Sequence, residues 1–375
     1  MKTAFYCFIV ILLTSLVISK VVNVAMCNPI PHPAIQMPYE HIHADISLVE
    51  DMIIANVTGI YTFINLDYEN VTMRYPIPPD STVKFVKIGN SSLDWWYTNE
   101  TYLTYMGNYT VIKWFIEPVP ETFNITVCYE HPLHLCRSQA VLGTYGFLYA
   151  MGTGKLLTNG YKETTAYVTI TVDKNIVQGS ISLHTVEWTG YMWIIMPADF
   201  NLTSEDEKWI VTATFQSEPL EPLKEDLLLT FIEGIPPDIS DPIQNPAKNI
   251  QPNQTVNVLV NVSDIGIGVF NVTLWYTVDD RISWIPIPMN KTSWKTYQAT
   301  IPGFEKGTCI SYKIIAYDAA GNKAENNNNS LYYTYTVVPE YSFTTALAIL
   351  ILSTILVIAF KKEGIFRGFL QPSLV

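Results

Sequence analysis

The chain has 375 residues, of which 49% are hydrophobic, 13% aromatic and 15% charged, and its formal net charge is -12 at pH 7. Charged residues usually make up about a quarter of a soluble domain, so polarity here rests on Asn, Thr, Ser and Tyr. The acidic balance argues against nucleic acid as a partner, because phosphates need a basic surface, and it suits a protein that stays soluble on a crowded cell surface.

Residues 1–27 have the pattern of a secretory signal peptide. Lys2 precedes an apolar run from Ala4 to Ile18, and Ala25-Met26-Cys27 offers a cleavage position before Asn28. An uncleaved signal anchor is the alternative, because the apolar character continues almost to the cleavage position. In both cases the middle of the chain is exported.

Residues 28–40 are rich in proline and are expected to form a linker. Residues 41–234 are predicted to be a mostly antiparallel β domain, because runs rich in Val, Ile, Tyr, Thr and Trp alternate with breaks that carry Asn, Gly, Asp or Pro. One or two short helical turns are expected near Glu221–Leu228. The predicted strands are His43–Glu50, Met52–Ile64, Thr82–Ile88, Tyr109–Phe115, Phe123–Tyr129, Phe147–Met151, Thr164–Val172, Ser180–Glu187, Tyr191–Met196 and Trp209–Phe215.

A second domain is predicted at residues 235–338. Pro236-Pro237 marks its start, because two successive prolines cannot lie in a central strand. Seven short strands in about a hundred residues have the size and rhythm of an immunoglobulin-like sandwich. The predicted strands are Asp238–Ile243, Thr255–Val262, Val269–Thr277, Trp284–Met289, Tyr297–Ile301, Cys309–Tyr317 and Leu331–Val337.

The motifs of this domain resemble those of known surface modules. Pro236-Pro237, Asp264-Ile265-Gly266, Ile301-Pro302-Gly303 and the turn Ala316-Tyr317-Asp318-Ala319-Ala320-Gly321-Asn322 are similar to the immunoglobulin-like or fibronectin type III-like modules of microbial surface proteins. In that turn Asp318 can cap the backbone and Gly321 can supply a positive φ. The resemblance covers Ile235–Val338 and implies an extracellular β-sandwich.

Residues 342–360 are predicted to be a transmembrane helix, because this stretch contains no charged residue. Nineteen residues rising about 1.5 Å each give roughly 29 Å, close to the thickness of a hydrocarbon core. Hydroxyl residues such as Ser353 and Thr354 can hydrogen-bond to their own helix. Three basic residues follow, which places the tail 361–375 in the cytosol and the chain before Pro339 outside: Lys361, Lys362 and Arg367.

Pro339-Glu340-Tyr341 before this segment is similar to the Pro-Glu-Phe-type C-terminal ends of archaeal surface proteins, with Tyr341 in the place of Phe. The resemblance implies a C-terminal anchor that a sortase-like enzyme processes. It points to an archaeal-type cell-surface protein.

Asn-x-Ser/Thr sequons are far more frequent than expected. They include twelve of the 24 asparagines, whereas about three or four would arise by chance, and all twelve lie between the two apolar ends. The pattern predicts glycosylation outside the membrane. The twelve sequon asparagines are Asn56, Asn70, Asn90, Asn99, Asn108, Asn124, Asn201, Asn253, Asn261, Asn271, Asn290 and Asn328.

Cys128 and Cys136 flank a short stretch that contains Pro132, so a small-loop disulfide is the first interpretation in an oxidising exterior. A zinc site formed by these cysteines with His131 and His134 is the alternative, although four ligands within nine residues do not follow usual spacings.

Other candidate metal ligands are weaker, and the sequence predicts no metal site and no cofactor. His41 and His43 are more typical of a solvated strand. Four aspartates near turns of the second domain are more typical of turn caps than of a calcium site: Asp264, Asp279, Asp280 and Asp318.

No catalytic motif is present. Gly152-Thr153-Gly154-Lys155 is too short for a phosphate-binding loop, and neither Gly-x-Ser-x-Gly nor His-Glu-x-x-His occurs, so we expect no enzyme. Aromatic residues suggest a flat platform for sugar rings, although core strands use the same residues. The candidates are Trp95, Trp96, Tyr97, Trp188, Tyr191 and Trp193.

The sequence thus predicts an all-β chain: a mostly antiparallel β-sandwich, an immunoglobulin-like β-sandwich and a C-terminal transmembrane helix. We expect a single-pass glycoprotein of the cell membrane, its bulk extracellular and its C-terminus cytosolic, with a structural, adhesive or recognition role. Envelope proteins or polysaccharide are the expected partners besides the membrane. A saccharide- or solute-binding accessory subunit is the alternative, and an exported hydrolase is a third.

Overall fold

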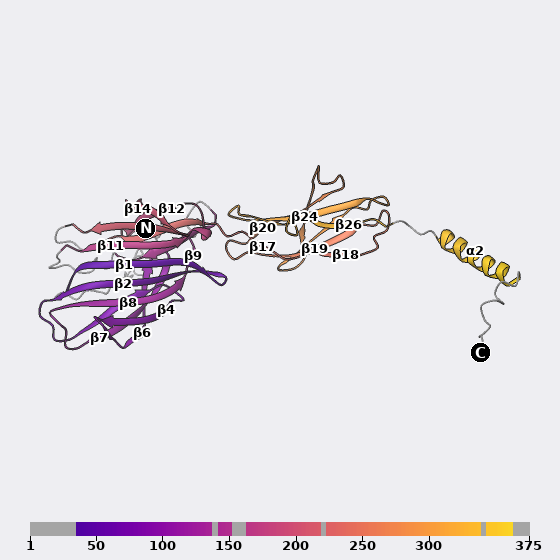
Figure 1. The fold of residues 1–375 in the computed structure, drawn as a ribbon. Helices are drawn as coiled ribbons and strands as arrows, with labels where there is room; N and C mark the ends of the chain where they lie inside the picture. Colours follow the sequence, from indigo (N-terminus) through magenta and orange to yellow (C-terminus); the bar gives the residue numbers. More distant parts are fainter. Residues whose placement is uncertain (1–34, 137–141, 152–162, 219–222, 339–342, 363–375) are drawn as a thin grey trace, which may run out of the picture. The chain divides into compact units, whose positions relative to one another are not determined.

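The computed structural model describes residues 35–136, 142–151, 163–218, 223–338 and 343–362 (Figure 1). Contacts within the chain divide it into two units, residues up to 235 together with 265–267, and the remainder from 236 onward. The division beside Pro236-Pro237 falls where the sequence predicts the second domain to begin. The predicted signal, the Pro-Glu-Tyr motif and residues 363–375 of the tail lie outside the described residues.

The first unit is built on an eight-stranded sheet, called sheet A here. Its strands are antiparallel except for β1 and β11, which run parallel. In spatial order they are β14 (Asn201–Glu205), β15 (Lys208–Gln216), β11 (Thr165–Asp173), β1 (Ile35–Val49), β2 (Met52–Asn65), β8 (Thr122–Pro132), β4 (Thr82–Ile88) and β5 (Ser91–Ser92).

Two smaller sheets complete this unit, together with a single 3-10 turn, η2 (Lys174–Ile176). Sheet B contains β3 (Val71–Ile77), β7 (Gly107–Ile116) and β6 (Trp95–Thr104). Sheet C contains β13 (Trp193–Pro197), β12 (Val177–Trp188), β16 (Asp226–Glu233), β10 (Thr144–Tyr149) and β9 (His134–Leu135).

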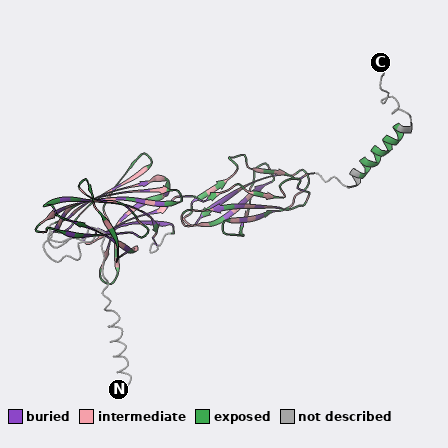
Figure 2. Cartoon of the chain, turned by 90° about the horizontal axis from the view of Figure 1, so that it is seen from below, coloured by how far each residue is buried: buried purple, intermediate pink, exposed green. Residues whose placement is uncertain are grey.

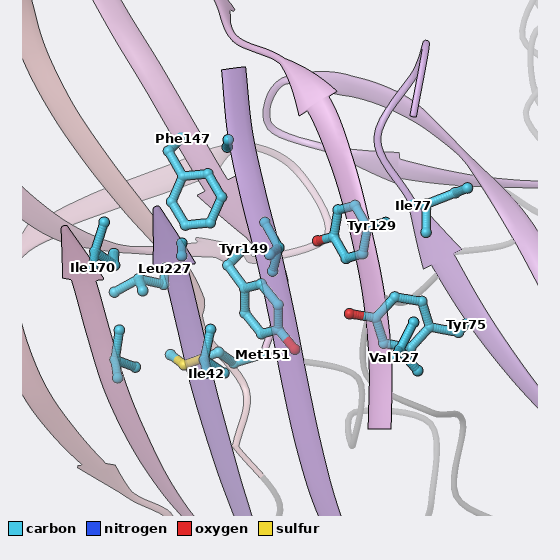
Figure 3. Close-up of a cluster of buried hydrophobic side chains, with 14 of the residues drawn as sticks. Ile42, Tyr75, Ile77, Val127, Tyr129, Phe147, Tyr149, Met151, Ile170 and Leu227 are labelled. Carbon is cyan, nitrogen blue, oxygen red and sulfur yellow. The ribbon is translucent and has the colours of Figure 1, made fainter. Parts of the chain in front are cut away.

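The core of the first unit lies between sheet A and the two smaller sheets. Alternate residues of β1, β2, β8 and β11 are buried, as period-2 strands with one covered face require. Figure 3 shows Ile42 and Ile170 packed near Leu227 and Tyr149, so residues far apart in sequence share this core. A smaller cluster on the other face of sheet C is formed by Tyr102 and Tyr109 of the β6–β7 hairpin with Leu148, Val186 and Leu228.

Strand β16 corrects the sequence prediction of helical turns near Glu221–Leu228, of which residues 219–222 lie outside the described part. From Asp226 the chain is a strand, paired with β10 on one side and β12 on the other. Leu227 and Leu229 belong to the main core, whereas Leu228 belongs to the smaller cluster. Because both faces are covered, the strand has no alternation of apolar and polar residues to distinguish it from a helix.

The predicted linker at residues 28–40 is also corrected, because β1 already begins at Ile35. The register of β1 against β2 shifts between Gln36 and Tyr39, at Met37 and Pro38. A bulge accommodates a proline that has no N–H to donate, so proline content alone was misleading.

Strands β3 and β6 were not predicted. Each lies at an edge of sheet B, and β3 carries Arg74 and Pro76 whereas β6 carries Asn99 and Glu100. These residues interrupt the apolar pattern, and edge strands tolerate such residues because one side of the ladder faces solvent. All ten strands that were predicted for this unit are present, most of them with shifted ends.

The second unit consists of two facing sheets around one core of buried residues. One sheet contains β17 (Asp238–Ile239), β18 (Ile243–Asn245), β19 (Val256–Ser263), β23 (Thr296–Ile301) and β22 (Asn290–Lys291). The other contains β21 (Ile285–Pro288), β20 (Val269–Thr277), β24 (Cys309–Asp318), β25 (Lys323–Asn326) and β26 (Tyr333–Thr336). Each of the seven predicted strand segments contains strand, and the first is divided between β17 and β18.

The turn after β24 has the geometry that the sequence predicts. Asp318 is buried and accepts hydrogen bonds from the backbone N–H of Asn322 at 2.8 Å and from its Nδ2 at 2.7 Å. Gly321 has φ +95°, a conformation that favours glycine. The carboxylate therefore closes the turn and satisfies two donors.

Helix α2 (Phe343–Lys362) is the one α-helix among the described residues. The side chains from Leu347 to Phe360 are all exposed, and this part of the helix is green in Figure 2. Within the part of the chain that the structure describes, no helix has both the length and the apolar character needed to cross a membrane. The predicted span 342–360 begins outside the described residues.

Replacing Asp318 with Ala is expected to destabilise the second unit by about 2–4 kcal/mol, because a buried carboxylate with two hydrogen bonds is lost and the Asn322 amide is left without that acceptor. Thermal and urea unfolding of the full chain measure the change. Asp238→Ala, at an exposed position in the same unit, is the control. Equal stability of the two variants would contradict the capping role.

Candidate functional site

All twelve sequon asparagines are exposed. Of the nine other asparagines that the structure describes, four are exposed (Asn175, Asn245, Asn249 and Asn329) and five are not (Asn65, Asn257, Asn322, Asn326 and Asn327). Exposure is therefore common to all the sequon asparagines but to fewer than half of the other described asparagines. An oligosaccharide needs such a position, because it cannot be accommodated in a packed core.

The six aromatic residues proposed as a sugar platform form two groups rather than one. In the first, the rings of Trp95 and Tyr97 lie 5.2 Å apart at 81°, an edge-to-face pair. In the second, Trp188 and Trp193 lie 5.2 Å apart at 51°, and Trp193 meets Tyr105 at 77°. Neither group presents coplanar rings, so neither forms the expected flat platform.

The β6–β7 hairpin separates the two groups. Trp95 and Tyr97 lie at the start of β6, whereas Tyr105, which contacts Trp193, lies in the turn at its end. At about 3.3 Å per residue this spacing is roughly 25–30 Å, more than one or two sugar rings can bridge. The second group lies beside the turn between β12 and β13, where Tyr191 is 92% exposed.

The predicted disulfide between Cys128 and Cys136 is corrected, since both are buried thiols. The chain does not turn back at Pro132, which is the last residue of β8 and pairs with Ile54. Cys128 lies on the outer face of sheet A, with Sγ 3.6 Å from Thr58 Oγ1, whereas the Cys136 N–H donates to Thr144 in sheet C. The extended path of β8 keeps the two thiols apart.

The same path rules out the alternative zinc site. His131 and Cys128 point to opposite faces of β8, and His131 lies in the core between Tyr129 and Phe147. Its Nδ1 is 3.1 Å from the Pro132 carbonyl oxygen, and burial lowers the pKa of the ring to about 4. His131 is therefore a neutral core residue at pH 7.

The remaining candidate ligands have structural roles in the described residues. His41 stacks on Tyr167 at 4.9 Å on the exposed face of sheet A. Asp264 accepts from the Gly268 N–H at 2.7 Å, and Asp279 caps its turn by accepting from Thr277 and Ser283. The Ser283 bonds hold the pKa of Asp279 at about 2. Asp279 and Asp318 thus cap turns as the sequence predicted, and the structure also brings carboxylate oxygens of Asp264 and Asp318 within 4.8 Å of one another.

A buried polar cluster was not predicted. The Tyr61 hydroxyl hydrogen-bonds with that of Tyr75 at 2.9 Å and with that of Tyr149, and Glu40, 0% exposed, is the partner of Tyr61 in the β1–β2 register. Figure 3 shows Tyr75 and Tyr149 inside the sandwich. Burial and the nearby Glu40 raise the pKa of Tyr61 and Tyr149, so both phenols stay protonated and link β2, β3 and β10.

Two grooves lie on the surface of the first unit. The larger, about 760 Å³, lies between Ile88, Phe115 and Asn124 and contains Glu117 as its one titratable side chain among the described residues. The other, about 560 Å³, contains His131 and His134 with Glu130, whose carboxylate pairs with Lys84 at 2.7 Å. Neither groove combines a nucleophile with a base that orients it.

Comparisons with known proteins identify no family. No protein-family model matches the chain, and no curated protein matches its sequence. A protein from Legionella pneumophila described as nutrient-binding has 14% identity and a TM-score of 0.36 over 55% of this chain and 70% of that one.

Two enzyme structures, a metallopeptidase and a hydrolase, are similarly distant. An M1 zinc metallopeptidase from Deinococcus radiodurans has 12% identity and a TM-score of 0.30, over 55% of this chain and 44% of that one. Yeast LTA4 hydrolase has 8% identity and a TM-score of 0.32, over 60% of this chain and 32% of that one. All these TM-scores are below 0.5, so none of the likenesses carries an argument about this chain.

The buried His131 predicts an acid dependence of stability. Its folded pKa of about 4 lies below the unfolded value of about 6.5, so the unfolded state takes up a proton first as the pH falls. The stabilisation is complete above about pH 6.5, and about 3 kcal/mol is lost between there and pH 4. His131→Phe retains the stacking and should remove this dependence.

Urea unfolding of the full chain gives the free energy of unfolding of wild type and His131→Phe at pH 7.5 and at pH 4. The effect is the amount by which wild type loses more stability than His131→Phe between these two pH values. His43→Phe, at an exposed position of β1, is the matched control. Parallel pH profiles for wild type and His131→Phe would contradict the assignment.

Proposed function

We propose that the chain is a single-pass surface glycoprotein, which carries two β units outside the membrane on α2 and works at the cell envelope in a structural, adhesive or recognition role. The observation that carries the proposal is the exposure of all twelve sequon asparagines, compared with four of the nine other described asparagines. Sequons that arose by chance would be distributed like the other asparagines.

The exposed apolar surface of α2 is the observation that favours an anchor at residues 342–360, although α2 as described does not itself have the length and apolar character of a spanning helix. Large apolar side chains are exposed on every side of it, including Ile349, Leu350, Ile355 and Ile358, each at least 56% exposed. A helix that is apolar all round has no favourable place in water, whereas lipid removes that surface from solvent. The hydroxyls of Ser353 and Thr354 donate to the Leu350 carbonyl oxygen, so neither needs a water partner.

The sequence after α2 supports the proposed orientation, and the second unit supports a role as a spacer between the membrane and the first unit. Lys361, Lys362 and Arg367 follow the apolar segment, and basic residues favour the cytosolic side. The second unit, with two facing sheets over about a hundred residues, has the arrangement of an immunoglobulin-like module, which serves as a spacer in surface proteins.

Glycosylation is tested at β14, where Asn201 and Thr203 form a sequon on a fully exposed strand. Thr203→Ala is expected to abolish the added sugar mass on Asn201, whereas Thr203→Ser keeps the sequon and the mass. Peptide mass spectrometry of the chain from its native host measures both. Unmodified Asn201, Asn56 and Asn271 in the wild type would contradict the proposal.

Topology is tested with intact cells and external protease. Peptides from residues 35–338 are expected to be released, while the tail beyond Lys362 stays protected until the membrane is permeabilised. Release of the tail from intact cells would show that the proposed orientation is wrong. Protection of both units would show that they are not outside.

A further inference from the structure

Every sheet of the first unit ends in two edge strands, and most of these edges are blocked. The edges are β14 and β5 in sheet A, β3 and β6 in sheet B, and β13 and β9 in sheet C. An exposed edge strand can pair with another chain unless charged side chains, a proline, a bulge, a covering element or its short length prevents the pairing. Glu205 in β14, Arg74 in β3 and Glu100 in β6 supply charge, whereas β5 and β9 have two residues each.

Four of the seven sequon asparagines of the first unit also lie at edges, whereas Asn56, Asn108 and Asn124 lie in the central strands β2, β7 and β8. Asn201 begins β14, Asn99 lies in β6, and Asn70 and Asn90 directly precede β3 and β5. By contrast, no sequon occurs between Asn124 and Asn201, the stretch that contains β13. Among the described residues, the β13 edge therefore has neither a charge nor a sequon, and the one blocking feature it contains is Pro197, its last residue.

The composition of β13 is that of a strand that pairs. It reads Trp-Ile-Ile-Met-Pro, with no charge in its five residues. Ile194 is 40% exposed and Met196 57%, and Met192 just before the strand is 62% exposed. These three side chains share one face of the strand, because side chains alternate along it.

The ladder with β12 shows which backbone groups are available. The Thr189 N–H donates to the Met192 carbonyl oxygen and the Ala198 N–H to that of Leu183, so hydrogen-bonded pairs occur at even-numbered residues of β13. The backbone groups of Trp193 and Ile195 consequently point to the free side. Pro197 is also on that side, where its missing N–H breaks no bond with β12.

We propose that β13 is a self-association site, at which it pairs antiparallel with β13 of a second copy of this chain around a two-fold axis at Ile194. Trp193 of each copy then lies opposite Ile195 of the other, and their outward N–H and C=O groups form four hydrogen bonds. Pro197 lies outside these four bonds. The edge is thus complementary to itself in donors and acceptors.

The side chains fit the same arrangement. The two copies of Ile194 face one another as a non-hydrogen-bonded pair, in which Cα atoms approach to about 4.5 Å and side chains are closest. Met192 lies opposite Met196 of the second copy on the same face. Exposed apolar surface is covered on both copies, and no like charges meet across the axis even though the chain has a net charge of -12.

The association state of the full chain, purified in a mild detergent, gives the first test. Mass measurement by sedimentation or light scattering is expected to show a dimer. Ile194→Lys places two ammonium groups at the axis and should raise the dimer dissociation constant about tenfold or more. Leu202→Lys on the blocked edge β14 is the matched control and should leave the dimer unchanged, with both variants retaining the wild-type circular dichroism.

Cross-linking gives a second test that does not depend on tolerance of a charge. In a Cys309→Ser background, Ile194→Cys is expected to form an intermolecular disulfide under mild oxidation in membranes, because this pair has the Cα separation that a disulfide requires. Leu202→Cys should not. A monomeric wild type, or a dimer that Ile194→Lys leaves intact and Ile194→Cys does not cross-link, would overturn the proposal.

Discussion

The first unit depends on the position of β1, which pairs antiparallel with β2 and parallel with β11. The strands on one side of β1 come from residues 52–132, whereas those on the other side come from residues 165–216, more than a hundred residues after β1, and β1 joins the two sets. Its alternating burial directs Ile42, Ala44 and Ile46 into the core and leaves His41 and His43 on the outer face. A slip of one residue would exchange these sets, so apolar alternation fixes the register.

The sequence was sufficient where a pattern is local. Alternation predicted β2, β11 and β20, and the Asp318–Asn322 turn followed from side chains four residues apart. It was insufficient where tertiary context decides. Leu227–Leu229 is apolar on both faces, so periodicity could not separate strand from helix, and the path of β8 decides that Cys128 and Cys136 stay apart. For the candidate site, local sequence predicted which asparagines carry sequons, but whether Trp95 and Trp193 share a platform depends on sheet order.

The surface of the first unit is organised by its edges and its sequons together. With the exception of β13, the edge strands of the described residues carry charges, are very short, or have a sequon asparagine in or beside them. Asn and Thr thus supply surface polarity in a chain in which only 15% of residues are charged. The buried Tyr61, Tyr75 and Tyr149 cluster shows the reverse arrangement, in which polar groups are satisfied by one another inside the core.

The place of β16 has a consequence for how the first unit is made. It is the last strand of the unit to be synthesised, yet it fills the middle of sheet C between β10 and β12. Until Asp226–Glu233 emerge, β10 and β12 present facing edges with no strand between them, and the two apolar faces that Leu227–Leu229 complete remain open. A nascent chain shorter than this cannot close the core of the first unit, so folding of that unit waits until β16 has been synthesised, and its apolar surface stays exposed during that interval.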